Sequence, residues 1–442
     1  MSAGSRGSRV SAASSLHIAT CATLIAYVAD RCLTSEPTPG QRSRTPHGRP
    51  TTGRRPARSP TVVTAPGAET PRATTEPAAP GTGTPVRHDD GGRPEVVTLG
   101  ESMVTFLPTV PGPLADVPAF ERGIGGAESN LACTLARAGH RVRWISRVGE
   151  DGFGTHLVRA IAACGVDTGG VRHDDRRPTG IYFRTAGERA VRKDERAAAE
   201  AAPLAEVVYY RAGSAASAMS PATMDVPALL AGRILHVSGI TAALSAGCLA
   251  LLREVTAPRA GRPLVSFDVN YRVSLWPDAT EAGHVLRVLA DASDLVFVGE
   301  DEAAVAWGVT GGPEAIRAAL PGPALVVVKQ GAHGAVALGA DGSRDFVPAL
   351  TVDVVAPVGA GDAFAAGFLS ATLRALPVRD RLRHGHLMAA AALTVPGDLA
   401  VPPSRERADR LAALDDTAWG TLRLGPGWTD ADPRAQEEVP TR

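Results

Sequence analysis

A glycine-rich turn followed directly by an aspartate is the segment of this sequence best suited to chemistry. It reads Gly359-Ala360-Gly361-Asp362 and leads into apolar and small residues that predict a helix. Two glycines let several backbone N–H groups converge on one point, where the positive end of the helix dipole also attracts an anion. Asp362 could then accept a proton from a hydroxyl group that attacks a phosphate held there. The alternative is a helix N-cap without a ligand, since one glycine turn is weak evidence.

A second glycine loop, Gly125-Gly126, runs into another predicted helix, with Asn130 on its first turn. The loop would let a polyhydroxylated ligand approach the backbone closely. The Asn130 amide offers both a donor and an acceptor to neighbouring hydroxyl groups. The alternative is an ordinary loop with Asn130 in solvent. Read alone, the loop does not decide between the two.

Polar residues follow the apolar segment Leu264-Val265-Ser266-Phe267 in the order Asp268-Val269-Asn270-Tyr271-Arg272. At the carboxyl end of a buried strand, such residues line a crevice. The Arg272 guanidinium could clamp a carboxylate or a phosphate, which a sugar with hydroxyl groups alone does not require. A surface salt bridge is the alternative.

Two further clusters combine a cation with groups that could recognise a ligand. Tyr209-Tyr210-Arg211 suits a small anionic ligand beneath a flap, although paired tyrosines also serve packing. The segment from Lys329 to Gly334, which includes Gly331, predicts a tight turn near a nucleotide, with Lys329 as a point charge for phosphate. Lys329 is conspicuous because Lys193 is the only other lysine of the chain.

Acidic residues cluster in Gly299-Glu300-Asp301-Glu302, after the predicted strand Leu295–Val298. Through water molecules, Glu302 could organise magnesium, which nucleotide chemistry requires. The alternative is the acidic first turn of a helix, which the helix dipole favours without any metal. The histidines lack the spacing of a zinc site.

The composition excludes some classes of partner. The 442 residues contain 46 Lys and Arg against 46 Asp and Glu, so no net charge indicates nucleic acid, another acidic partner or a basic one. Five cysteines form neither a disulfide framework nor a CxxC pair, and we therefore expect a cytoplasmic protein.

Residues 1–93 are rich in Ser, Thr, Pro, Gly and Arg and predict a disordered extension. Its apolar run at 16–29 only loosely resembles a secretory signal and is too short to span a bilayer.

From Glu95 onward, short apolar segments alternate with helical ones. The predicted strands are Val96–Leu99, Val142–Val148, Ile234–Val237, Leu264–Phe267, Leu295–Val298, Leu325–Val328 and Ala335–Leu338. The predicted helices include Glu128–Ala138, His156–Ala163, Leu244–Val255 and Ala363–Leu376. The alternation indicates an α/β fold, a mostly parallel sheet flanked by helices on both faces, with ligands at the carboxyl ends of the strands. Segments within about 181–211 predict a small β flap, or lid, which would also be a natural contact in a homo-oligomer.

Taken together, these segments resemble the ribokinase-like sugar kinases of the phosphofructokinase-B family. The resemblance extends from about Glu95 to about Pro403, and its strongest signature is the turn that ends in Asp362. It implies a kinase domain at 94–403 and a C-terminal tail at 404–442. The branch that phosphorylates the sugar acid 2-keto-3-deoxygluconate, using ATP and magnesium, is the most similar. The motifs that narrow the match are Gly100-Glu101, Gly125–Asn130, Tyr209-Tyr210-Arg211 and Asp268–Arg272.

The resemblance implies a role for each cluster. Asp362 would be the catalytic base, ionised at neutral pH, and Gly359, Ala360 and Gly361 would form the anion hole. The sugar acid would be held by Gly126, Asn130, Tyr182, Tyr209, Arg211 and Asp362. ATP would be bound by Asn270, Arg272, Lys329, Gly331, Gly334, Gly359 and Gly361, and magnesium by Glu302. The expected product is 2-keto-3-deoxy-6-phosphogluconate.

Two departures from the family pattern matter. An acidic residue usually stands three positions before the anion hole, and here that position is Ala356, which makes activation by a monovalent cation doubtful. The asparagine of the magnesium motif is replaced by Gly299, so magnesium would bind mainly through water.

A fructokinase-like or ribokinase-like enzyme for a neutral sugar is the alternative within the same chemistry. A sugar-binding regulatory module without turnover is the alternative from another class.

Overall fold

The computed structural model describes residues 92–110, 112–185 and 207–430. Nearly all of the extension predicted at 1–93 lies outside the described residues, as does the segment 186–206 within the predicted flap. Every described element belongs to one compact unit. No helix among the described residues is long and apolar enough to cross a membrane.

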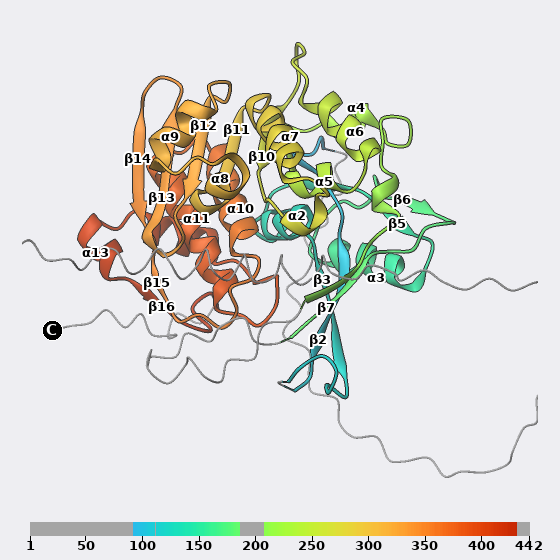
Figure 1. The fold of residues 1–442 in the computed structure, drawn as a ribbon. Coiled ribbons are helices and arrows are strands. Elements are labelled where there is room, and N and C mark those ends of the chain that lie inside the picture. The colour runs from blue at the N-terminus through green and yellow to red at the C-terminus, as the bar shows by residue number, and fades with distance from the viewer. Residues whose placement is uncertain (1–91, 111, 186–206, 431–442) are drawn as a thin grey trace, which may run out of the picture. The chain divides into compact units, whose positions relative to one another are not determined.

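An eight-stranded sheet, in the order β14-β13-β12-β11-β10-β9-β1-β4, is the framework of the domain (Figure 1). The strands from β12 to β4 pair in parallel, whereas β13 and β14 are antiparallel. This confirms the predicted mostly parallel α/β sheet. The bounds are β1 (Val96–Leu99), β4 (Val142–Ile145), β9 (Ile234–Ser238), β10 (Leu264–Asp268), β11 (Leu295–Gly299), β12 (Leu325–Lys329), β13 (Gly334–Gly339) and β14 (Arg344–Pro348).

Helices cover both faces of this sheet because the central strands are apolar on both sides. Val96 of β1 packs in one core with α2, α10 and α11, whereas its neighbour Val97 packs in another with α6 and α7. The main helices are α2 (Ala127–Arg137), α3 (Gly152–Ala163), α4 (Val226–Leu229), α5 (Gly239–Ala243), α6 (Ala246–Thr256), α7 (Ala279–Asp291), α8 (Glu300–Trp307), α9 (Gly312–Ala319), α10 (Ala360–Leu373) and α11 (Val378–Leu393).

A separate four-stranded sheet, in the order β3-β2-β7-β8, forms the lid. The sequence predicted only its second half, and it missed the first two strands. Phe106 stacks on Phe183 with ring centroids 4.7 Å apart, and Phe120 meets Phe183 edge-on, so aromatic contacts join three of the strands. The bounds are β2 (Met103–Pro108), β3 (Phe120–Gly125), β7 (Ile181–Arg184) and β8 (Val207–Tyr210).

The residues after 403 differ from the predicted tail. The structure folds 405–424 onto the main body as α12 (Arg405–Ala412), α13 (Asp416–Thr421) and β16 (Arg423–Leu424), which pairs with β15 (Thr351–Val352). Trp419 is buried there, and the Arg383 guanidinium lies 4.7 Å from its ring centroid. The predicted strand Val142–Val148 is also divided, because β5 (Arg147–Gly149) leaves the main sheet to pair with β6 (Arg172–Asp174).

Candidate active site

A cavity of about 1120 Å³ lies at the carboxyl ends of the parallel strands and is bordered by the lid. Asp268 ends β10 and Lys329 ends β12, and the pairing of Gly299 with Lys329 brings the ends of β11 and β12 to the same edge. Every site residue predicted from the sequence lines this cavity: Gly126, Asn130, Tyr182, Tyr209, Arg211, Asn270, Arg272, Glu302, Lys329, Gly331, Gly334, Gly359, Ala360, Gly361 and Asp362.

The turn before α10 has a backbone that only glycine fits well. Gly359 is the N-cap of the helix, with φ of 73°, and a Cβ atom there would lie 2.5 Å from the carbonyl oxygen of Asp398. The first N–H groups of a helix have no partner within the helix. At α10 they belong to Ala360, Gly361 and Asp362, at the cavity wall, where the dipole also favours a negative charge.

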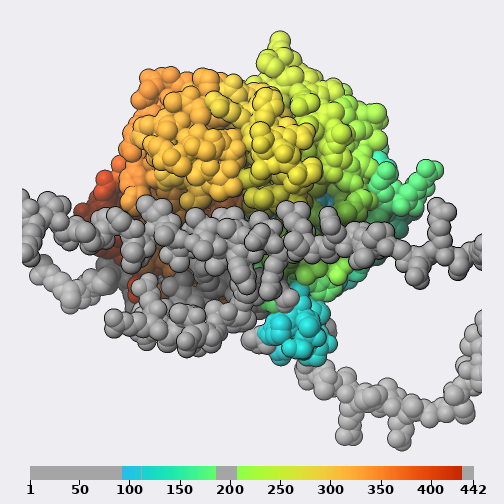
Figure 2. Space-filling view, in the orientation of Figure 1, coloured from blue at the N-terminus to red at the C-terminus, as the bar shows by residue number. Residues whose placement is uncertain are grey.

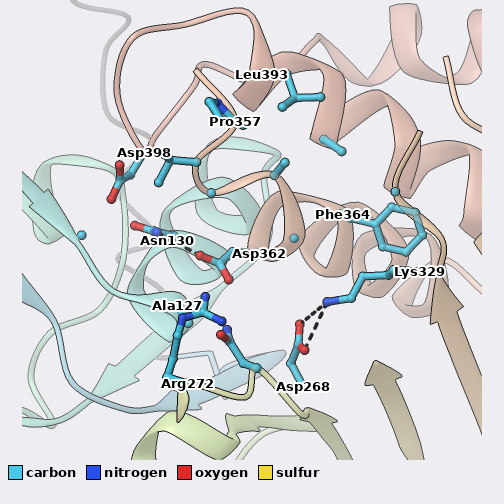
Figure 3. A pocket seen from close by; sticks show the side chains of 18 of the residues that line it. Ala127, Asn130, Asp268, Arg272, Lys329, Pro357, Asp362, Phe364, Leu393 and Asp398 are labelled. Atoms are coloured by element: carbon cyan, nitrogen blue, oxygen red, sulfur yellow. Dashed lines mark hydrogen bonds and ion pairs between the residues drawn. The ribbon is translucent and has the colours of Figure 1, made fainter. Parts of the chain in front are cut away.

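Asp362 is held by Asn130 across the cavity. Asn130 Nδ2 donates a hydrogen bond to Asp362 Oδ2 at 3.0 Å (Figure 3). Burial raises the pKa of Asp362 to about 7, with a contribution from Asp268, while the bond from Asn130 and the charges of Lys329 and Arg272 oppose the rise. The expectation of a carboxylate that is fully ionised at neutral pH needs correction, because Asp362 titrates close to pH 7 in the protein without ligands.

We expect this pKa to appear in the pH dependence of catalysis. A general base acts in its deprotonated form, so kcat/KM should fall by about tenfold for each pH unit below 7 and level off above it. The measurement is the rate of ADP release from pH 5 to 9 with low acceptor. In Asp362→Asn, the kcat/KM of the residual activity should no longer fall below pH 7. A wild-type kcat/KM that stays level from pH 7 down to pH 5 would contradict the assignment.

Lys329 supplies a fixed positive charge beside the same helix end. Its Nζ lies 2.9 and 3.2 Å from the two carboxylate oxygens of Asp268. Burial lowers the pKa of Lys329, but attraction by Asp268, Glu302 and Asp362 outweighs it, so the pKa is raised and the ammonium stays charged. A Cβ atom on Gly361 would lie 3.6 Å from Nζ, which places the charge next to the N–H groups of α10. The sequence placed Asp268 among the polar residues that line a crevice, but assigned it no individual role.

Arg211 lines the cavity, but an acidic neighbour already balances its charge. Its guanidinium pairs with Glu101, and Ser214 Oγ donates to the other carboxylate oxygen of Glu101 at 2.5 Å. Glu101 is buried, and the Arg211 side chain is 10% exposed. Arg211 is therefore held rigidly in place rather than free to swing toward a ligand. The sequence contained a signal for Glu101 in Gly100-Glu101, although no role was assigned to it.

Unlike Arg211, Arg272 has a guanidinium that no carboxylate pairs with among the described residues. Its guanidinium points towards Asp362 in Figure 3 and donates to the carbonyl oxygen of Tyr271 at 3.3 Å. Among the described residues it forms no ion pair, so its charge remains available to an anionic ligand. Asn270 beside it has φ of 39°, an uncommon conformation for a residue with a side chain. The Oδ1 atoms of Asn270 and Asn130 are buried and have no partner in the described structure, which suits hydroxyl donors of a ligand.

Glu302 is tied to the backbone. Its Oε2 accepts the N–H of Gly299 at 2.7 Å and its Oε1 accepts the N–H of Tyr271 at 3.0 Å, so it caps the start of α8. This geometry favours the reading of Glu302 as part of an acidic first turn, although the side chain also lines the cavity. Within the described ranges, no group of three His, Cys, Asp or Glu residues is placed to hold a metal ion.

The part of the cavity beside the turn at Gly331 and Gly334 is apolar. Gly331 has φ of 56° and Gly334 has φ of 143°, and a Cβ atom on Gly334 would lie 2.4 Å from the carbonyl oxygen of Val347. This tight turn borders an apolar wall that suits a flat, weakly polar ring. The wall includes Leu350, Val352, Val354, Pro357, Phe364, Ala389 and Leu393.

The lid contributes Tyr182 and Tyr209, whose ring centroids are 5.4 Å apart. Tyr182 is buried and donates a hydrogen bond from its hydroxyl group to Asp398 at 2.8 Å, whereas Tyr209 is exposed. Asp398 and Arg184, which also line the cavity, were missed by the sequence analysis. Arg184 lies within the predicted flap at about 181–211, but no role in the site was assigned to it.

A helix N-terminus, the buried Asp362 carboxylate and two buried amide oxygens without a partner in the described structure meet in this cavity, an arrangement suited to phosphoryl transfer to a hydroxyl group. Residues 93–405 match the pfkB family of carbohydrate kinases, and the chain belongs to that family. It is therefore a sugar kinase with a ribokinase-like fold.

The named relatives include kinases of a sugar acid and a fructokinase. It is 36% identical over 318 residues to the 2-dehydro-3-deoxygluconokinase of Bacillus subtilis (71% of this chain, 94% of that protein) and 34% identical over 322 residues to that of Thermoproteus tenax (72% and 94%). It is also 31% identical over 330 residues to a probable chloroplastic fructokinase of Arabidopsis thaliana (71% and 81%). The crystal structure of the 2-dehydro-3-deoxygluconokinase of Thermotoga maritima superposes with a TM-score of 0.63 at 25% identity (73% and 99%).

Proposed function

We propose that this sugar kinase transfers the γ-phosphate of ATP to the terminal hydroxyl group of 2-keto-3-deoxygluconate, which is also called 2-dehydro-3-deoxygluconate. The products are 2-keto-3-deoxy-6-phosphogluconate and ADP. The observation that carries the reaction type is Asp362, held by Asn130 in front of the free N–H groups of α10. Relatives that bear this activity in their names support the choice of acceptor.

In the proposed mechanism, Asp362 accepts the proton of the acceptor hydroxyl as its oxygen attacks the γ-phosphorus. The bond from that phosphorus to the bridging oxygen breaks, and the electron pair leaves on ADP. The N–H groups of Ala360 and Gly361 stabilise the charge on the transferred group, and the Lys329 ammonium lies beside them. Positioning and electrostatics contribute most of the catalysis.

ATP fits the remainder of the cavity. The turn at Gly331 and Gly334 and the apolar wall would hold the base, and Asn270 and Arg272 would lie towards the phosphates. A magnesium ion bound through water beside Glu302 would neutralise charge on the phosphates during transfer. Glu302 fits such an ion better through water than directly, because both its oxygens accept backbone N–H groups.

The carboxylate of a sugar acid would meet Arg211, whose guanidinium is oriented by Glu101. Arg272, which lies towards the phosphates, brings a charge without an ion-pair partner among the described residues. The Glu101 pair is also the observation that favours the alternative, a kinase of a neutral sugar, because it removes the net charge of Arg211. The intact turn and Asp362 argue against a sugar-binding module without turnover.

We expect Arg211→Ala to raise the KM for 2-keto-3-deoxygluconate by about tenfold or more while leaving the KM for ATP within about threefold, since a charge-assisted hydrogen bond is worth roughly 1.5–3 kcal/mol. ADP release at varied acceptor and varied ATP measures both constants. Arg344→Ala is the control, because Arg344 pairs with exposed Glu314 outside the cavity. Equal increases in the two KM values would contradict a role for Arg211 in binding the carboxylate.

A further inference from the structure

Asp398 connects the lid to the main body through a buried carboxylate. It follows α11, and its Oδ2 accepts the hydrogen bond from Tyr182, while its Oδ1 accepts one from Arg184 Nη2 at 2.8 Å. The side chain of Asp398 is only 4% exposed. Both donors lie on β7, two residues apart and therefore on the same face of the strand. One residue of the main body thus holds the inner face of the lid strand.

The same residue packs against both glycine turns of the cavity. A Cβ atom on Gly359 would lie 2.5 Å from the Asp398 carbonyl oxygen, and one on Gly125 would lie 2.5 Å from Asp398 Oδ2. The backbone of Asp398 therefore touches the anion-hole turn while its carboxylate touches the loop that leads to Asn130. Figure 3 shows Asn130 between Asp398 and Asp362 in this view. A shift of Asp398 would therefore displace both the turn at Gly359 and the loop at Gly125.

Removing the Asp398 carboxylate from water costs free energy, which its hydrogen bonds and its ion pair must offset. Burial raises the pKa of Asp398, and the Arg184 charge and the Tyr182 hydrogen bond oppose that rise. Aromatic packing of Phe106, Phe120 and Phe183 already joins the lid strands to one another. The ion pair of Arg184 with Asp398 instead joins β7 to the main body, so what it adds is a fixed position of β7 relative to that body.

We propose that Asp398 is a positioning residue that holds β7, and with it Tyr182, in a fixed place relative to the anion hole at Gly359. It acts through Tyr182 and Gly359 and does not touch the reacting atoms. Acceptor binding depends on this contact more than ATP binding does, because Tyr182 borders the acceptor end of the cavity. This last consequence rests on the proposed function, whereas the mechanical link between β7 and the main body does not.

The test compares Asp398→Asn with Asp174→Asn. The asparagine keeps the shape of Asp398 but leaves the Arg184 charge unpaired. Asp174 is the control, because its side chain is also nearly inaccessible to solvent, pairs with Arg147 at 2.8 Å and lies outside the cavity. Hydrogen exchange of the peptide that contains β7 is measured first, without any ligand. The KM values for ATP and for whichever acceptor the wild type phosphorylates are measured second.

We expect exchange in β7 to rise by about tenfold or more in Asp398→Asn, which corresponds to about 1.4 kcal/mol, but not in Asp174→Asn. The KM for the acceptor should rise by about tenfold, with the KM for ATP within about twofold. Unchanged exchange in β7, or equal increases in both KM values, would overturn the proposal. If the wild type phosphorylates no acceptor, the proposed function fails, while the exchange measurement still decides whether Asp398 holds the lid.

Discussion

Asp362→Asn is expected to lower the kcat of ADP release by about 10³-fold, within the range of roughly 10² to 10⁴ for the loss of a general base. The asparagine oxygen can still accept the hydrogen bond from Asn130, so the site keeps its shape while it loses the group that takes the proton. The KM for ATP should therefore change little. The two constants are obtained from ADP release at saturating acceptor with varied ATP.

Asp409→Asn is the control for this variant. Asp409 is also a paired carboxylate, since it accepts two hydrogen bonds from Arg374, but it lies on α12 away from the cavity. Its replacement should leave kcat within about twofold, because surface ion pairs contribute little. Full activity of Asp362→Asn would refute the assignment of the base, whatever the other variants do.

Gly359→Ala is expected to lower kcat by about 10²-fold or more, in the range found for the loss of an oxyanion-hole donor. The alanine Cβ would lie 2.5 Å from the Asp398 carbonyl oxygen, so the turn must move and the N–H groups of Ala360 and Gly361 move with it. Alanine at the left-handed φ of 73° is strained, which lowers the free energy of unfolding by about 1–2 kcal/mol. Steady-state ADP release and thermal unfolding measure the two effects.

Gly342→Ala is the control that separates the backbone strain of a left-handed alanine from the clash with Asp398. Gly342 has φ of 84°, but nothing lies within 4 Å of the Cβ position, so the substitution brings the backbone strain without the clash. It should therefore lower stability by a similar 1–2 kcal/mol, about the cost of a left-handed alanine, and leave kcat unchanged. If the two variants lose activity equally, the effect of Gly359→Ala comes from general destabilisation and not from the anion hole.

The parts of the site that could be predicted are those encoded in local sequence. The turn at Gly359 requires glycine for reasons of backbone geometry, and Asp362 and Asn130 each follow a glycine turn at the start of a helix. The apolar strands were predictable because both faces of the main sheet are covered. Parallel pairing then brought the polar residues after β10 and β12 to one edge of the sheet.

The parts that could not be predicted depend on contacts between distant segments. Asp398 is 216 residues from Tyr182, and Glu101 is 110 residues from Arg211. No pattern near Asp398 indicates that its carboxylate would be buried under the lid. The pKa of Asp362 is equally a property of the fold, because burial and the nearby Asp268 raise it against the effect expected of a helix N-terminus. The missed strand β3 carries charged and glycine residues in Glu121-Arg122-Gly123, which are atypical of a strand.

The most direct test of the central claim is ADP release by the full chain with ATP, magnesium and a panel of acceptors. The panel contains 2-keto-3-deoxygluconate, 2-keto-3-deoxygalactonate, fructose and ribose, and the product is identified by mass spectrometry. We predict the highest kcat/KM with one of the two sugar acids, with the phosphate on the terminal hydroxyl group. A higher kcat/KM with fructose or ribose would contradict the proposed substrate, and the absence of ADP release with every acceptor would contradict the proposed activity.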